Sequence, residues 1–131
     1  MNLTAQEIFA LRTELIHQRR WNELAAHYAE DAVVDMPFAL PEPVRLHGRP
    51  AIEAHLATAA LAPLAFTVEN VVIHQTADAE VIIAEYDYLL SVTTTGKTQR
   101  VSNIQLFRVR NGQIVETRDY HDHHRIRQAL T

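Results

Sequence analysis

The second half of the chain limits the possible folds most, because long β-like runs follow one another there with hairpin signals between them. Val, Ile and Tyr are frequent in these runs, as is typical of strands. Asn111-Gly112 is a strong two-residue hairpin signal, and Thr95-Gly96-Lys97 indicates a second turn. We therefore expect an antiparallel meander of four strands: Thr67–Gln75, Glu80–Thr93, Gln99–Arg110 and Gln113–Asp122.

The first half of the chain has helical patterns instead. Thr4 and Glu7 form a capping-box pattern ahead of apolar residues at helical spacing. The elements expected here are a first helix from Thr4, a short second helix from Trp21 to Tyr28, a strand at Ala32–Met36, a proline-rich loop and a third helix at Ala51–Leu61. His123–Leu130 is expected to form a last helical turn. Helices followed by a meander indicate an α+β fold, and 131 residues suit one domain, 1–131.

Charge and composition exclude several classes of function. The net charge is −4, which argues against nucleic acid or an anionic membrane surface as partner, since both attract basic proteins. No apolar run approaches the roughly 18 residues of a membrane span, and the N-terminal residues show no export signal. Cysteine is absent, so neither a disulfide nor a thiol site is possible. We expect a cytoplasmic protein.

Side-chain alternation along Glu80–Thr93 suggests what each face of that strand does. Tyr86, Tyr88 and Leu90 share one face, which we expect to form a homodimer interface. Glu85 and Asp87 share the other face among apolar neighbours. A buried carboxylate must be paired, solvated or protonated, so these two acids indicate either a ligand pocket or a strand end in water.

Asp119 is the strongest candidate for a functional carboxylate. If it shares a face with Asp87, a bent sheet would gather carboxylates with further polar groups, a mixture suited to water activation or proton transfer. The polar side chains expected beside them are Asn103, Gln105 and His121. His121 is an alternative base. The competing interpretation is that Asp119 is a surface residue paired with an arginine.

The histidines near the C-terminus do not make a convincing metal site. His121 and His123 have a usable ligand spacing, but no third ligand cluster stands out. Phosphate-loop, nucleophile-elbow and zincin motifs are absent as well. We expect neither a metal nor a cofactor.

Several motifs together resemble those of SnoaL-like members of the nuclear transport factor 2-like superfamily. In chain order they are Tyr28-Ala29-Glu30-Asp31-Ala32, Gly48-Arg49-Pro50-Ala51-Ile52, Asn111-Gly112-Gln113-Ile114-Val115 and Arg118-Asp119-Tyr120-His121-Asp122. The resemblance covers nearly the whole chain. It implies a cone-shaped, strongly curved antiparallel sheet wrapped around three N-terminal helices and enclosing one apolar pocket. This fold hosts isomerases, cyclases, hydrolases and non-enzymes.

Within that superfamily, the chain resembles limonene-epoxide-hydrolase-like members most. The resemblance places Asp119 at the position of the base, Asp87 at that of the acid, and Asp35 where a residue orients water or substrate. Val33 and Glu85 depart from the pattern, since a Tyr and an Arg are expected there. The pattern of ketosteroid isomerases fails, because its three functional positions carry Met36, Arg12 and Gln105.

These observations predict a cofactor-independent enzyme that acts on a small apolar molecule by acid–base chemistry of Asp119, Asp87 and Asp35. Epoxide hydrolysis, isomerisation and polyketide cyclisation are the reactions considered. The alternative is a non-catalytic protein of the same fold that binds a small molecule. The residues expected to line the binding site are Met36, Phe38, Glu85, Asn103, Gln105 and His121.

Overall fold

The computed structural model describes residues 2–131. In this part of the chain the helices are α1 (Ala5–His17), α2 (Trp21–Ala25), α3 (Arg49–Leu61) and α4 (His123–Ala129). The strands are β1 (Tyr28–Met36), β2 (Val44–His47), β3 (Leu64–Gln75), β4 (Val81–Val92), β5 (Thr98–Arg110) and β6 (Gln113–Tyr120).

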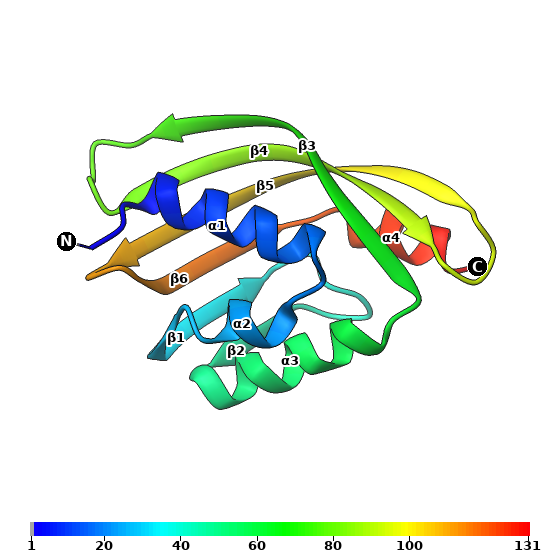
Figure 1. The fold of residues 1–131 in the computed structure, drawn as a ribbon, viewed down its shortest axis with the longest axis horizontal. Coiled ribbons are helices and arrows are strands. Elements are labelled where there is room, and N and C mark those ends of the chain that lie inside the picture. Colours follow the sequence, from blue (N-terminus) through cyan, green and yellow to red (C-terminus); the bar gives the residue numbers. More distant parts are fainter. Residues whose placement is uncertain (1) are drawn as a thin grey trace.

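The strands form one curved sheet in the order β2-β1-β6-β5-β4-β3, with helices against its inner face (Figure 1). All neighbouring strands are antiparallel except β1 and β6, which run parallel. The α+β class and the curved sheet around the N-terminal helices are therefore confirmed. The parallel pair is a departure from the expected all-antiparallel sheet.

The local signals of the sequence are largely present in the structure. The Thr4 hydroxyl accepts a hydrogen bond from the amide of Glu7 at 3.2 Å, and the Glu7 carboxylate accepts one from the amide of Thr4 at 2.9 Å. Asn111 and Gly112 both have positive φ, 51° and 73°, as a two-residue hairpin turn requires.

Two elements of the first half differ from expectation. Tyr28 begins β1 rather than ending the second helix, and the proline-rich segment includes the short strand β2. β2 was not predicted, because its four residues are too few to carry a periodic signal. Both elements extend the sheet beyond the predicted meander.

The sheet bends where its pairing is irregular. The register of β3 with β4 shifts between Glu69 and Val72, where Asn70 has a φ of 55°. A second shift separates Arg108 from Val109 in the pairing of β5 with β6. Because such bulges bend a strand and increase its twist, the inner face becomes concave and leaves room between sheet and helices.

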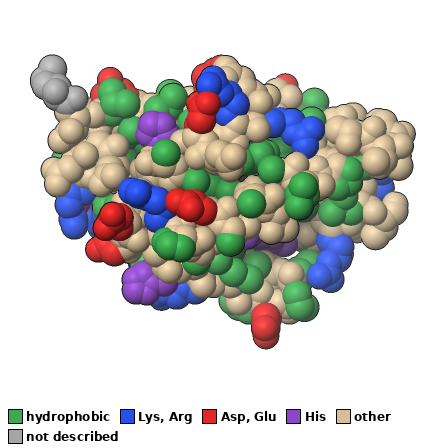
Figure 2. All heavy atoms as spheres, turned by 60° about the horizontal axis from the view of Figure 1, so that its bottom comes forward, with side chains coloured by type: hydrophobic (Ala, Val, Ile, Leu, Met, Phe, Trp, Pro, Cys, Tyr) green, Lys and Arg blue, Asp and Glu red, His purple; other side chains and the backbone are tan. Residues whose placement is uncertain are grey.

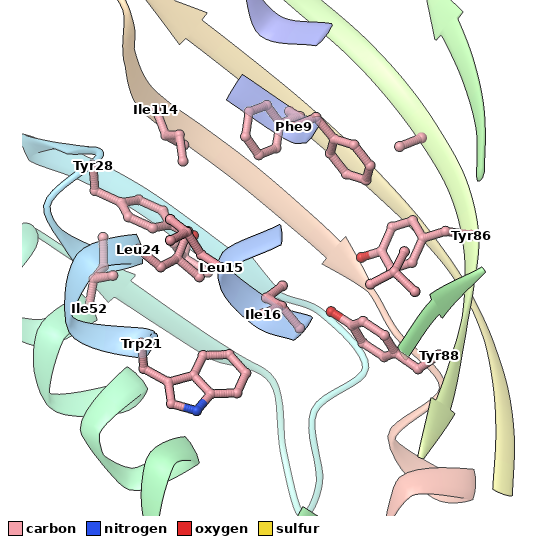
Figure 3. Packing of buried hydrophobic residues seen from close by; sticks show 14 of the residues in the cluster. Phe9, Leu15, Ile16, Trp21, Leu24, Tyr28, Ile52, Tyr86, Tyr88 and Ile114 are labelled. Atoms are coloured by element: carbon pink, nitrogen blue, oxygen red, sulfur yellow. The ribbon is translucent and has the colours of Figure 1, made fainter. Parts of the chain in front are cut away.

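The core lies between this concave face and α1. Phe9 of α1 packs on Tyr86 of β4 and Phe107 of β5, with ring centroids 5.6 and 5.7 Å apart. Figure 3 shows Tyr86 and Tyr88 pointing from β4 toward α1. Because these two tyrosines and Leu90 are buried within the single chain, the prediction that they form a homodimer interface is wrong.

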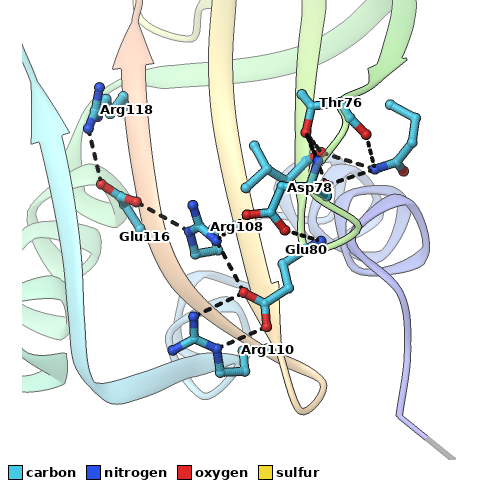
Figure 4. A network of polar contacts seen from close by, with 9 residues as sticks. Thr76, Asp78, Glu80, Arg108, Arg110, Glu116 and Arg118 are labelled. Atoms are coloured by element: carbon cyan, nitrogen blue, oxygen red, sulfur yellow. Dashed lines mark hydrogen bonds and ion pairs between the residues drawn. The ribbon is translucent and has the colours of Figure 1, made fainter.

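The outer face of the sheet carries charges. Figure 4 shows acids and arginines that alternate across β6, β5 and the turn before β4. Glu80 binds Arg108 and Arg110, and Glu116 contacts Arg108 and Arg118. Acidic, basic and apolar side chains are also interspersed over the face shown in Figure 2. Among residues 2–131, every helix is too short or too polar to cross a lipid bilayer.

Candidate functional site

A cavity of about 160 Å³ lies between the concave face of the sheet and the helices. Its apolar wall comes mainly from the helices, including Ile16, Trp21, Ile52 and Leu56. The sheet and the segment after it contribute most of the polar groups. The polar lining residues are Arg12, Tyr28, His55, Tyr88, Gln105, Asp119, His121 and His123.

Asp119 of β6 is the carboxylate on the cavity wall. It pairs across the sheet with Gln105 of β5, which in turn pairs with Ala84 of β4. Directly paired residues of antiparallel strands point to the same face, so the register itself turns Asp119 inward. The Gln105 amide donates a hydrogen bond to Oδ1 of Asp119 at 2.6 Å. This bond fixes the carboxylate while its other oxygen remains free of hydrogen bonds from residues 2–131.

His121 follows β6 and lies on the same wall. Its Nε2 atom and the Tyr86 hydroxyl are 2.5 Å apart. Burial lowers the pKa of His121 to about 4; nearby Asp119 opposes this effect, whereas Arg12 and His123 add to it. Burial also raises the pKa of Tyr86 well above its ordinary value. Both groups are therefore neutral at pH 7.

Arg12 of α1 also lines this cavity. Its Nη2 atom donates a hydrogen bond to the Tyr88 hydroxyl at 2.9 Å and a weaker one to the Tyr86 hydroxyl at 3.5 Å. The guanidinium also lies over the rings of Phe9 and Tyr86, 5.2 and 5.4 Å from their centroids. These contacts hold the side chain in one orientation.

Two further histidines complete the polar lining. Burial lowers the pKa of His55, and it also lowers that of His123; Asp119 opposes the effect in both cases. Neutral imidazoles can bind metals, but within residues 2–131 no three His, Asp or Glu side chains are grouped as metal ligands would be. The lining offers hydrogen-bonding groups around an apolar space.

Asn103, an expected binding residue, is buried and positions the segment that follows β6. Its Oδ1 atom accepts a hydrogen bond from the amide of Asp122 at 3.2 Å, and its amide nitrogen donates to the carbonyl oxygen of Val101 at 3.3 Å. Asp122 in turn caps α4 by accepting a hydrogen bond from the amide of Arg125. Asn103 therefore holds the backbone of the segment that carries His121 and His123.

The expectation that Asp87 and Asp119 share a face is wrong. Asp87 pairs with Ser102, and it lies on the outer face, where Asn70 and Ser102 each donate it a hydrogen bond at 2.8 Å. These two bonds lower the pKa of Asp87. Glu85 is on the same outer face, with its carboxylate 2.6 Å from Nε2 of His74.

The first strand also divides its predicted residues between the two faces. Met36 is buried and lines the cavity. Asp35 points outward, 3.7 Å from Arg45, into a separate outer hollow. Phe38 is 62% exposed and packs against Tyr120 outside the cavity. The structure therefore brings Met36, Gln105, Asp119 and His121 together, and it separates Asp35, Phe38, Glu85 and Asp87 from them.

Sequence reasoning missed Arg12, Tyr86 and Tyr88 as site residues. A signal for Arg12 was present, because this residue lies four positions from both Ile8 and Ile16, on the buried stripe of α1. A charged residue within an apolar stripe calls for a polar partner in the interior. The two tyrosines provide that partner.

The curved sheet, the covering helices and the largely apolar cavity between them define an α+β domain. A model of the SnoaL-like domain matches residues 10–117, and the chain belongs to this family. YesE, an uncharacterized protein of Bacillus subtilis (strain 168), is 34% identical over 113 residues, which span 78% of this chain and 68% of YesE.

Two crystal structures illustrate the shared fold. A candidate isomerase from Bacillus subtilis has a TM-score of 0.88 at 24% identity, over 96% of this chain and 91% of that one. A candidate polyketide cyclase from Xanthomonas campestris pv. campestris has a TM-score of 0.80 at 21% identity, over 97% of this chain and 96% of that one. Both likenesses show that the chain shares its fold with these two proteins.

Proposed function

We propose that the protein is a cofactor-independent enzyme that transfers a proton at a carbon next to a carbonyl group of a small, largely apolar substrate, with Asp119 as general base. The observation that carries this proposal is the Asp119 carboxylate on the wall of an apolar cavity, with one oxygen fixed by Gln105 at 2.6 Å. The names of the two structural relatives, a candidate isomerase and a candidate polyketide cyclase, agree with this class of reaction.

The free oxygen of Asp119 would take the proton from the carbon, and the electron pair of the C–H bond would move onto the carbonyl oxygen. If a C=C bond is conjugated with the resulting enolate, Asp119 could return the proton to the far carbon of that bond, which gives an isomer. The enolate carbon could instead attack a second carbonyl of the same molecule, and Asp119 would then give its proton to the oxygen of that carbonyl, which gives a ring. A positioned general base contributes typically 10²–10⁴-fold to such a step.

We assign to His121 the stabilisation of the negative charge that develops on the carbonyl oxygen. Because Tyr86 keeps its proton, we assign its hydroxyl as the donor to Nε2 of His121. The proton of the neutral imidazole is then on Nδ1, where it can donate to the substrate. Preorganised donors in a water-poor site stabilise an oxyanion strongly. His121 itself is a poor base, since its pKa is about 4 and its Nε2 is occupied.

Epoxide hydrolysis in the manner of limonene-epoxide-hydrolase-like proteins is not part of this proposal. That mechanism would need Asp87 as acid and Asp35 as orienting residue beside Asp119. Both carboxylates point away from the cavity and have partners on the outer face.

The proposal can be tested without knowing the substrate. In D2O, an enzyme of this class exchanges the protons next to the carbonyl of compounds that fit the cavity, which NMR detects in a panel of monocyclic ketones and oxo acids. We expect Asp119→Asn to lower the exchange rate about 100-fold or more. Asp87→Asn, which removes a carboxylate from the outer face, is the matched control and should exchange at the wild-type rate.

The outcomes separate the two candidate functions. Unchanged exchange in Asp119→Asn would remove Asp119 from the role of base. Binding of panel compounds without exchange, and with equal affinity in Asp119→Asn, would instead favour the alternative of a non-catalytic binding protein with the same cavity.

A further inference from the structure

The reaction proposed above leaves one buried charge unused, the guanidinium of Arg12. This side chain is only 5% exposed and lines the cavity. Its Nη2 atom binds Tyr88, but its Nη1 atom is buried without any hydrogen-bond partner in residues 2–131. An arginine remains charged in proteins, so one residue that lines the cavity is a buried cation with an unpartnered donor.

The surroundings of Arg12 supply no counter-charge in direct contact. The rings of Phe9 and Tyr86 hold the guanidinium plane, but they are neutral. Asp119 lines the same cavity, yet its hydrogen bond is with Gln105, and Arg12 forms no ion pair within residues 2–131. Buried charges are normally paired, so a group that completes the site should be an anion.

Tyr88 adds a second donor beside Arg12. Arginine can only donate, so the Tyr88 oxygen accepts the hydrogen bond from Nη2. The Tyr88 hydroxyl keeps its own proton, which either the neighbouring Tyr86 oxygen or an oxygen of a ligand can accept. A guanidinium nitrogen next to a hydroxyl matches the two oxygens of a carboxylate, which guanidinium groups bind through paired hydrogen bonds.

The size of the space limits the rest of the ligand. The cavity is about 160 Å³, and a cavity of about 150 Å³ is known to hold a benzene molecule. Its other walls are formed by apolar side chains such as Ile52 and Leu56. A molecule of roughly one ring, or a branched chain of similar size, would fit there.

We propose that the substrate is a small oxo acid of about one ring in size, whose carboxylate binds Nη1 of Arg12 and the hydroxyl of Tyr88. This inference rests on the proposed function, in which the carbonyl of the same molecule lies near Asp119 and His121. Arg12 binds the carboxylate at the α1 side of the cavity and neutralises its charge. Asp119 of β6 can then remove the proton from the carbon next to the carbonyl group.

Binding can be followed through Trp21, because it is the single tryptophan of the chain and lines the cavity. Cyclohexanecarboxylate and its neutral amide, cyclohexanecarboxamide, have similar shapes and do not absorb where tryptophan is excited. We expect the wild-type protein to bind the acid at least tenfold more tightly than the amide. Equal or tighter binding of the amide would overturn the inference.

Substitution of the anchor provides the second test. Arg12→Gln should weaken binding of the acid at least tenfold and leave that of the amide within about threefold. Arg100→Gln, which removes an arginine from the outer face, is the matched control and should bind both as the wild type does. If Arg12→Gln retains the preference for the acid, the carboxylate does not bind at Arg12 and the inference is wrong.

The design also covers loss of folding and failure of the proposed function. Should Arg12→Gln not fold, Tyr88→Phe replaces it and must reduce the preference for the acid; an unchanged preference there overturns the carboxylate subsite.

Asp119→Asn is expected to bind the acid at least as tightly as the wild type, because a nearby negative charge is removed. Acid binding without exchange activity would refute the proposed reaction alone, whereas exchange of neutral ketones without acid binding would refute the subsite alone.

Discussion

The low pKa of His121 predicts that this one imidazole makes the protein less stable in mild acid. An unfolded chain protonates histidine near pH 6.5, whereas the folded protein does so only at about pH 4. Between these values the unfolded state binds a proton that the folded state does not, so the free energy of unfolding falls as the pH falls. At 1.36 kcal/mol per pKa unit, the full loss is about 3 kcal/mol.

Urea unfolding of the wild type and of His121→Asn at pH 7 and pH 4.5 measures this contribution. Between the two pH values, the wild type should lose about 2 kcal/mol more stability than the variant. The reason is that this change of pH covers most of the range between the pKa of His121 in the folded protein and its pKa in the unfolded chain. The absolute stability of the variant does not matter, since only the change with pH is compared. His124→Asn, an exposed site on α4, is the matched control and should follow the wild type.

Equal pH dependence of the wild type and His121→Asn would refute the reasoning. The ring of His121 would then be as easily protonated in the folded protein as in the unfolded chain.

Two further predictions concern the fold. Phe107→Ala should lower the free energy of unfolding by about 3–5 kcal/mol in chemical denaturation, because this fully buried ring packs against Phe9; a loss under 1 kcal/mol would contradict the described packing. Thr4→Ala should cost about 1 kcal/mol through loss of the cap on α1. Thr4→Ser, which keeps the hydroxyl, should restore most of that stability in the same measurement.

The meander could be predicted from the sequence because its signals are local. Asn111-Gly112 fixes the pairing of β5 with β6, and β-rich runs on both sides extend it. The parallel contact of β1 with β6 could not be predicted this way, because it joins residues as distant as Val34 and Thr117. Such a contact depends on how the helices pack between the two halves of the chain.

The face of β4 was assigned wrongly although the information was present. Both faces of this strand are largely apolar, so alternation alone does not show which one is inside. The register of the two hairpins does show which face is inside, because it places Ala84, Gln105 and Asp119 in one cross-strand row. Asp87 is three residues from Ala84 and therefore on the other face. Tyr86 and Tyr88 then point inward, where Arg12 provides a polar partner.

The position of Arg12 within the buried stripe of α1 limits which walls of this cavity can change by substitution. Neighbouring residues of that stripe, such as Phe9 and Ile16, hold the domain together, so the anchoring cation cannot shift without loosening the whole molecule. The opposite wall is freer, because His55, Leu56 and Ala59 of α3 line the cavity while remaining partly exposed. Substitution of these side chains would reshape the cavity for a substrate with a different hydrocarbon portion. The binding of the carboxylate at Arg12 would be retained.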